Sequence, residues 1–124
     1  MNFDAIRNAI ENRFLTNWSA TPVAWPNVPF PPPATAWVRL SLLDGQAGNE
    51  TLANGVAYPG VIDIGVLVPE SAGAGQARTL ADQAAAIFNN QRFGGVACRA
   101  AYATVIGAAD GWWRMTVTVP FTYR

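Results

Sequence analysis

The first periodic pattern along the chain is an apolar stripe with the spacing of an α-helix. A helix brings residues three and four apart onto one side. The stripe is formed by Phe3, Ile6, Ile10, Phe14 and Trp18. Asn2 stands where a helix is capped, and Arg7 and Glu11 are spaced to pair on the outer side. We therefore expect a first helix, which Pro22 prevents from continuing.

A second helix is predicted from residue 76 to residue 90. Its apolar stripe consists of Ala77, Leu80, Ala84, Ile87 and Phe88. Gly94 and Gly95 follow its end, where glycine is common because it adopts the backbone conformation that stops a helix.

Between the two helices the pattern changes to the alternation of β-strands, in which successive side chains point to opposite sides. Residues 37–43 alternate between a wholly apolar side and a mixed side. Residues 61–68 form the clearest buried strand, and Pro69 ends it. Short strands at residues 51–53 and 56–58 have weaker patterns.

The last third of the chain predicts a β-hairpin. Residues 96–106 and 112–123 alternate with period two, and residues 107–111 connect them. The second strand combines an aromatic and aliphatic inner side with a threonine-rich outer side. Because neighbours in a strand face opposite sides, only one of Trp112 and Trp113 can lie in the core.

These elements predict an α+β fold. Their order is helix, two or three strands, helix, two strands. The simplest packing is a twisted antiparallel β-sheet with both helices on one face. The length of 124 residues fits a single domain, residues 1–124. The other face of the sheet and its edges are then candidates for contact with other subunits.

Residues 21–35 form a proline-rich arm that carries six of the nine prolines. The arm lies within an uncharged stretch long enough for a membrane span, but its prolines break any spanning helix, so we expect a soluble, cytoplasmically synthesised protein. Trp25 and Phe30 are its two large side chains. Two interpretations stay open: both fold back onto the core, or both dock on a neighbouring chain. A stiff proline segment loses little entropy on docking.

The composition favours an oligomer and argues against nucleic-acid binding. Eight arginines balance eight acidic residues, so the net charge is zero and no basic cluster supports DNA or RNA binding. Only 13% of residues are charged, 51% are hydrophobic, and five are tryptophan. Compositional bias of a GC-rich genome accounts for part of the lack of lysine but not for the tryptophans. Such a small domain exposes apolar surface when it stays alone.

Most catalytic chemistry is excluded by residue type. Without histidine or lysine the chain has no Ser-His or Cys-His pair, no histidine metal site and no phosphate-loop lysine. Its one cysteine, Cys98, cannot form a redox pair. The carboxylates are scattered. We therefore predict no catalytic residue, no cofactor and no metal site.

Three local features have both a structural and a functional interpretation. Asp63 interrupts an apolar strand, and we expect it at the surface or an interface, opposite an arginine. The glycine-containing loop at residues 71–75 precedes a helix, as phosphate-binding loops do, but its third glycine position is Arg78. Trp112 and Trp113 are either a sugar-stacking platform or, as we expect, an interface anchor.

The arm carries the most specific resemblance to a known family. It reads Ala24-Trp25-Pro26-Asn27-Val28-Pro29-Phe30, followed by Pro31 to Pro33 and Trp37-Val38-Arg39. Together with Ile-Arg-Asn-Ala-Ile-Glu at 6–11, Val68-Pro69, Gly73-Ala74-Gly75 and Val119-Pro120-Phe121, it resembles the phage tail terminator-like family over nearly the whole chain.

The resemblance implies a structural virion protein. Members form a ring, typically a hexamer, that caps the head-proximal end of the tail tube, stops tube polymerisation and joins the neck. It implies tail tube and neck proteins as partners, a place in the virion tail after assembly in the host cytoplasm, and no enzymatic activity. The alternatives are another virion subunit, of the tube or the head–tail connector, and a small ligand-binding module.

Residues in the arm, the loops and the outer strand positions are the predicted subunit and partner interface. They are Trp25, Pro26, Asn27, Phe30, Asn49, Asn54, Asp63 and Trp112. Large aromatic side chains dominate the energetics of protein contacts, and loops order on docking.

Overall fold

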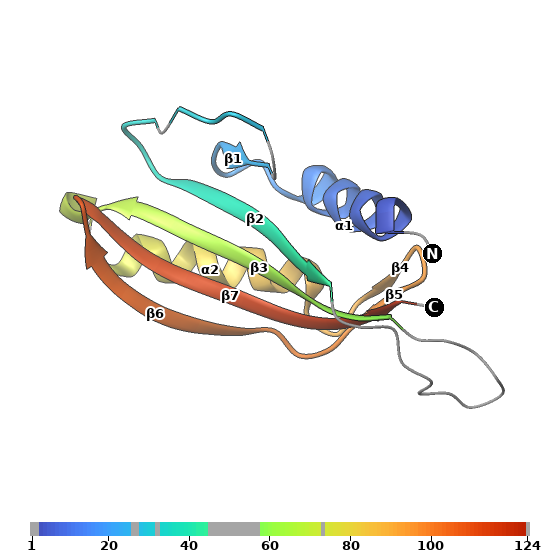
Figure 1. Cartoon of the computed structure of the whole chain (residues 1–124). Coiled ribbons are helices and arrows are strands. Elements are labelled where there is room, and N and C mark those ends of the chain that lie inside the picture. The colour runs from blue at the N-terminus through green and yellow to red at the C-terminus, as the bar shows by residue number, and fades with distance from the viewer. Residues whose placement is uncertain (1–2, 26–27, 32, 45–57, 73, 124) are drawn as a thin grey trace, which may run out of the picture.

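A computed structural model describes the chain except for residues 1–2, 26–27, 32, 45–57, 73 and 124 (Figure 1). The elements are α1 (Phe3–Asn17), β1 (Val23–Ala24), β2 (Trp37–Asp44), β3 (Tyr58–Pro69), the short 3-10 helix η2 (Glu70–Ala72), α2 (Ala74–Phe88), β4 (Arg92–Phe93), β5 (Val96–Cys98), β6 (Tyr102–Ala109) and β7 (Trp112–Tyr123). The predicted α+β fold is confirmed. Of the predicted short strands, residues 51–53, 56 and 57 lie outside the described part of the chain.

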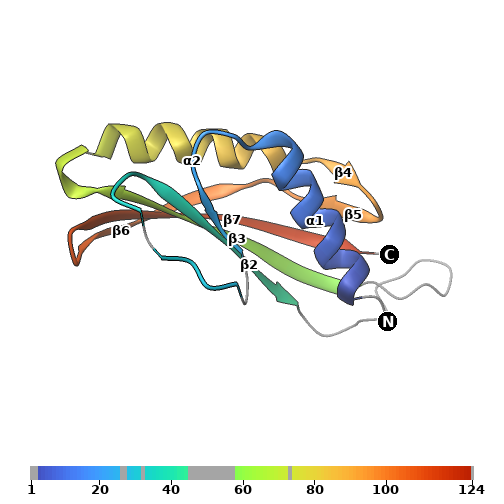
Figure 2. The same cartoon turned by 90° about the horizontal axis from the view of Figure 1, so that it is seen from above.

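One seven-stranded, mostly antiparallel sheet organises the molecule. Its strand order is β1-β2-β3-β7-β5-β4, and β6 pairs with β7 on the same side as β5. The long strands β3 and β7 pair over their full length at the centre. Both helices lie over the same face of the sheet (Figure 2), as predicted.

The arm contributes a strand that the sequence did not predict. β1 runs parallel to β2, with Val23 opposite Val38. The backbone N–H of Val38 also donates to the carbonyl oxygen of Pro22 at 3.2 Å. A proline-rich segment can add to a sheet only at its edge, because proline lacks the N–H that a central strand needs.

The predicted single strand at residues 96–106 is wrong, because the structure divides it into β5 and β6. The end of α2 holds the break: the N–H of Ala101 donates to Asn89 Oδ1 at 2.8 Å, and the N–H of Asn90 donates to the carbonyl of Arg99 at 3.1 Å. These bonds compete with continued pairing to β7.

The connection between β6 and β7 is also tighter than predicted, because β6 continues to Ala109. The turn consists of Asp110 and Gly111, whose φ angles are 55° and 83°. Two positive φ values are typical of a type I′ turn, whose twist matches that of a hairpin and which favours Asp-Gly.

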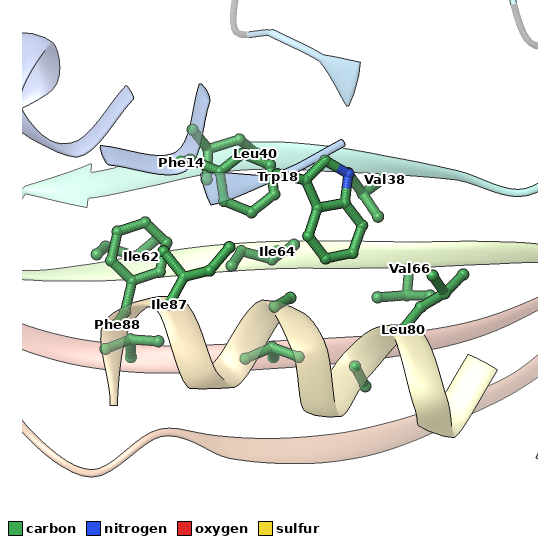
Figure 3. Packing of buried hydrophobic residues seen from close by; sticks show 14 of the residues in the cluster. Phe14, Trp18, Val38, Leu40, Ile62, Ile64, Val66, Leu80, Ile87 and Phe88 are labelled. Atoms are coloured by element: carbon green, nitrogen blue, oxygen red, sulfur yellow. The ribbon is translucent and has the colours of Figure 1, made fainter. Parts of the chain in front are cut away.

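A main core fills the space between the helices and the sheet (Figure 3). Phe14 of α1 stacks on Trp18 and on Phe88 of α2, with ring centroids 5.2 and 6.1 Å apart. The predicted helical stripes supply these side chains, so their burial stabilises both helices on the sheet. One detail differs from the prediction: Arg7 pairs with Asp4 at 3.3 Å rather than with Glu11. The exchange changes stability little, because an ion pair between exposed side chains contributes little.

Candidate interaction surface

The helices leave one face of the sheet uncovered. Alternation sends Ile62, Ile64 and Val66 of β3 into the main core, whereas Asp63 and Gly65 point the other way. We call this second side the open face. It consists of Trp37, Arg39, Ser41 and Leu43 of β2, Val61, Asp63, Gly65 and Leu67 of β3, and Trp112, Arg114, Thr116 and Thr118 of β7.

An aromatic cluster occupies one end of the open face. Trp37 contacts Phe30 at a centroid distance of 4.9 Å and Trp112 edge-on at 6.1 Å. Leu67 and Ala24 complete the cluster. Trp37 is only 3% exposed although neither α1 nor α2 covers it. The arm and the tip of the β6–β7 hairpin therefore meet over the end of β2.

A groove with two arginines adjoins the aromatic cluster. It is lined by Trp37, Arg39, Gly65, Val66, Leu67, Ile106, Asp110, Trp112, Arg114, Met115 and Thr116. The guanidinium of Arg39 lies 5.4 Å from the centre of the Trp37 ring, a cation–π distance. Gly65 leaves the floor of the groove without a side chain. The groove thus combines apolar walls with charged groups, as protein-binding surfaces do.

Asp63 lies on the open face, but its neighbours differ from the prediction. Directly across from it are Ser41 and Thr118, not an arginine. The hydroxyl of Thr118 donates to Asp63 Oδ1 at 3.3 Å. The carboxylate is half-buried, so this single bond leaves acceptor capacity for solvent or a partner chain.

The two large side chains of the arm reach different parts of the fold. Trp25 packs against the main core, with its ring edge-on to Phe14 at 6.2 Å. Phe30 packs against Trp37 in the aromatic cluster. Folding back onto the domain is the interpretation that these contacts favour. Both side chains stay half-buried, so each keeps surface for a neighbouring chain.

The structure therefore brings together only part of the predicted interface. Phe30 and Trp112 share the aromatic cluster, and Asp63 lies farther along the same face. Trp25 lies apart from them, against the main core. The remaining predicted positions, Pro26, Asn27, Asn49 and Asn54, lie outside the described residues. An interface role for all eight stays a prediction.

Trp37 and Arg39 are central to this surface, yet neither is among the residues predicted for the interface. The alternation of residues 37–43 put both on the mixed side of a strand. A tryptophan and an arginine two positions apart on the outer side of a strand were the available signal. Ile106 was missed because the β-bulge between Val105 and Gly107, which shifts the register, leaves no mark in a period-two pattern.

Three features of the described residues bear on metal binding, thiol chemistry and phosphate binding. These residues hold no group of three or more His, Cys, Asp or Glu side chains that could bind a metal ion. Burial raises the pKa of the Cys98 thiol to about 11, against the opposing effect of the Arg13 charge, so the thiol is protonated at neutral pH. The glycine-containing loop follows β3, whose paired neighbours are antiparallel, so it is not part of a parallel nucleotide-binding unit.

Membrane insertion through a helix has no support in the described segments. Neither α1 nor α2 is long and apolar enough to cross a bilayer.

Comparison with known proteins assigns the family. One solved structure superposes on the whole of this chain and on 96% of its own, with a TM-score of 0.77 at 24% sequence identity, which shows a shared fold. A search of curated protein sequences finds no match. The family described as phage tail terminator protein matches residues 5–121. The chain therefore belongs to the phage tail terminator family.

Proposed function

We propose that this structural phage tail protein is the terminator itself: a ring of six copies that caps the head-proximal end of the tail tube, stops tube polymerisation and joins the neck. The family match over residues 5–121 is the observation that carries the proposal. In this role the protein works by assembly, without catalysis. Its partners are further copies of itself, the tail tube protein and the neck proteins.

The open face fits a protein that works inside a larger assembly. It presents the aromatic cluster, two arginines and a floor at Gly65, where a partner backbone can approach closely. Aromatic and arginine side chains supply most of the binding energy at protein interfaces. Phe30 and Trp112 already contact Trp37 in the free chain, so docking on the aromatic cluster costs little ordering entropy.

The distribution of apolar side chains supports assembly as well. Six large hydrophobic residues of the described part are exposed: Leu15, Val28, Leu43, Tyr102, Val105 and Ile106. Three belong to one edge strand, β6, so exposed apolar side chains gather along this edge, with Tyr102 and Ile106 on the open face and Val105 on the helix side. Contiguous apolar patches mark contact sites. Burial in a ring interface, which commonly covers about 2,000 Å² or more, removes such a patch from water.

Deletion of the gene from the phage that carries it tests the function directly. Lysates of the deletion phage should contain tails of uncontrolled length that carry no heads, and expression from a plasmid should restore normal tails. Electron microscopy with tail-length measurement reads both effects. If the deletion phage still made tails of wild-type length joined to heads, the proposal would be contradicted. A complete lack of tail tubes would instead identify a tube subunit.

A purified system separates termination from other defects. The protein should stop the growth of tail tubes when it is added during their polymerisation, and its rings should be visible at one tube end. Incorporation along the tube, or long open cylinders of the protein alone, would show that it is a tube subunit rather than a terminator.

A further inference from the structure

β1, β4 and β6 are edge strands in the described part of the sheet, and they differ in their protection against pairing. β1 and β4 are each only two residues long. Pro22 directly precedes β1, and Arg92 lies in β4. Short length, proline and charge are the usual means by which proteins keep a sheet edge from adding another strand.

β6 has none of these protections. It is eight residues long and contains no proline and no charged residue. Seven of its residues are exposed, among them Tyr102, Val105 and Ile106 at 55%, 44% and 60%. Its inner side pairs with β7, and no described strand pairs with its outer side. Such an edge has unsatisfied backbone groups and apolar side chains together, which is the requirement for adding a strand.

The opposite side of the sheet offers a matching segment. β1 pairs with only Val38 and Arg39 of β2, so residues 40–43 have no described strand on their outer side. These residues read Leu-Ser-Leu-Leu, again without charge or proline. Leu43 is 59% exposed and shares the open face with Trp37 and Arg39 by alternation. Ile106 borders the groove on that same face.

We propose that β6 of one copy pairs with residues 40–43 of β2 in the next copy, so that one continuous sheet runs around the ring. This seam rests on the proposed ring. Strand directions alternate from β2 through β3 and β7 to β6, so a copy related by the ring rotation presents its β2 antiparallel to β6. The pairing places Leu43 on the shared open face together with Tyr102 and Ile106 of β6, whereas Val105, opposite the buried Met115, lies on the helix side.

Closure favours this head-to-tail seam over pairing of β6 with itself. A β6–β6 contact is symmetric and is complete at two copies, whereas two different edges leave one of each kind free until a ring closes. The net charge of zero removes overall repulsion between copies.

Cross-linking of single-cysteine pairs tests the seam. Leu43→Cys and Ile106→Cys place reactive thiols at the two edges, and a short bis-maleimide joins thiols that lie close without requiring disulfide geometry. The buried Cys98, whose pKa burial raises to about 11, supplies little thiolate at pH 7 and hence little background. Leu15→Cys on α1, 63% exposed, is the matched control. The reaction is run on the free protein and on tail tubes capped with it.

The seam predicts covalent dimers only when the Leu43→Cys and Ile106→Cys proteins are mixed, and a ladder of larger products when one chain carries both substitutions. Dimers from Ile106→Cys alone would overturn the seam in favour of β6–β6 pairing. The seam would also be overturned if the mixed proteins gave no more cross-linking than the Leu15→Cys control. This holds whether the free copies stay monomeric or form caps on tubes. Rings without the cross-link leave the proposed function standing, whereas tubes that grow past the added protein refute the function itself.

A charge on the edge gives a second readout. Ile106→Lys should reduce ring formation at least tenfold in apparent affinity while thermal unfolding of the monomer stays unchanged, because lysine on an exposed edge opposes strand addition. Leu15→Lys should leave assembly unchanged. Equal assembly of the two lysine variants in sedimentation experiments would overturn the seam.

Discussion

The two faces of the same sheet differ in what covers them. On one face, side chains such as Ile64 and Val117 lie fully buried beneath α1 and α2. On the other, Arg39, Asp63 and Thr118 remain without a helix above them. The strands are the same, so backbone geometry and β propensity are shared. The difference teaches that the chain covers one face itself, whereas neither α1 nor α2 covers the open face, which is where we propose that other chains bind.

The largest expected loss of stability comes from a substitution in the core beneath the covered face. Phe88 is fully buried, stacks on Phe14 at 6.1 Å and contacts the tilted ring of Phe93 at 5.9 Å. Phe88→Ala should lower the free energy of unfolding by about 3–5 kcal/mol, because the substitution loses apolar burial and leaves a cavity. Chemical denaturation measures it. Leu15→Ala, on the exposed side of α1, is the control and should change stability by less than about 0.5 kcal/mol. Equal effects would mean that the core does not hold the helices.

Trp112 and Trp113 are adjacent in sequence but lie on opposite faces of the sheet, so substituting each in turn compares the two faces. Trp113 packs against the main core, whereas Trp112 belongs to the aromatic cluster of the open face. Trp113→Ala should cost about 2–3 kcal/mol of stability, and Trp112→Ala about 1–2 kcal/mol, because both are half-buried. Assembly should reverse this order: at temperatures where both variants are folded, Trp112→Ala should weaken it more. Denaturation and sedimentation separate the two effects, and a common order in both would contradict the division of roles.

Much of this division could be predicted from the sequence. Helical stripes and strand alternation depend on residues close in the chain, so Phe14, Phe88 and the apolar side of β3 were identified correctly. Even the opposite orientation of Trp112 and Trp113 follows from period two alone.

The parts that could not be predicted depend on contacts between distant residues. β1 forms because the proline-rich segment pairs with β2. The break after β5 depends on a hydrogen bond to Asn89 at the end of α2. The candidate site was hard to predict for the same reason. Trp37 lies at its centre because Phe30 and Trp112, from distant parts of the chain, contact it in the fold. Asp63 was expected to face an arginine, but the register that sets its neighbours is a long-range property.

Two glycines of β3 sharpen the comparison at smaller magnitude. A Cβ at Gly60 would collide with the ring of Phe121 and lie 2.9 Å from the carbonyl oxygen of Leu43. At Gly65 on the open face, the nearest atom would be Arg39 Cβ at 3.9 Å, an ordinary contact. Gly60→Ala should therefore cost about 1–2 kcal/mol through overpacking. Gly65→Ala should be neutral or slightly stabilising, since alanine restricts the unfolded chain.

Thermal unfolding of the two alanine variants checks this contrast, at about 4 °C per kcal/mol for a chain of this size. The same variants probe assembly. Gly65→Ala places a methyl group on the floor of the groove, so weaker binding at unchanged stability would indicate that a partner backbone approaches there. A Gly65→Ala protein that melts as early as Gly60→Ala would show that the open face is covered in the free chain.

The smallest effect concerns the hydrogen bond between Thr118 and Asp63, which links side chains of β7 and β3 on the open face. A bond of 3.3 Å on a half-exposed surface competes with water, so its coupling energy should be about 0.5–1 kcal/mol. A double-mutant cycle with Asp63→Asn and Thr118→Val measures it by denaturation. Strand pairing continues on either side of the bond, so even the double variant should stay folded. A coupling above about 2 kcal/mol would mean that the open face, like the covered face, holds the monomer together.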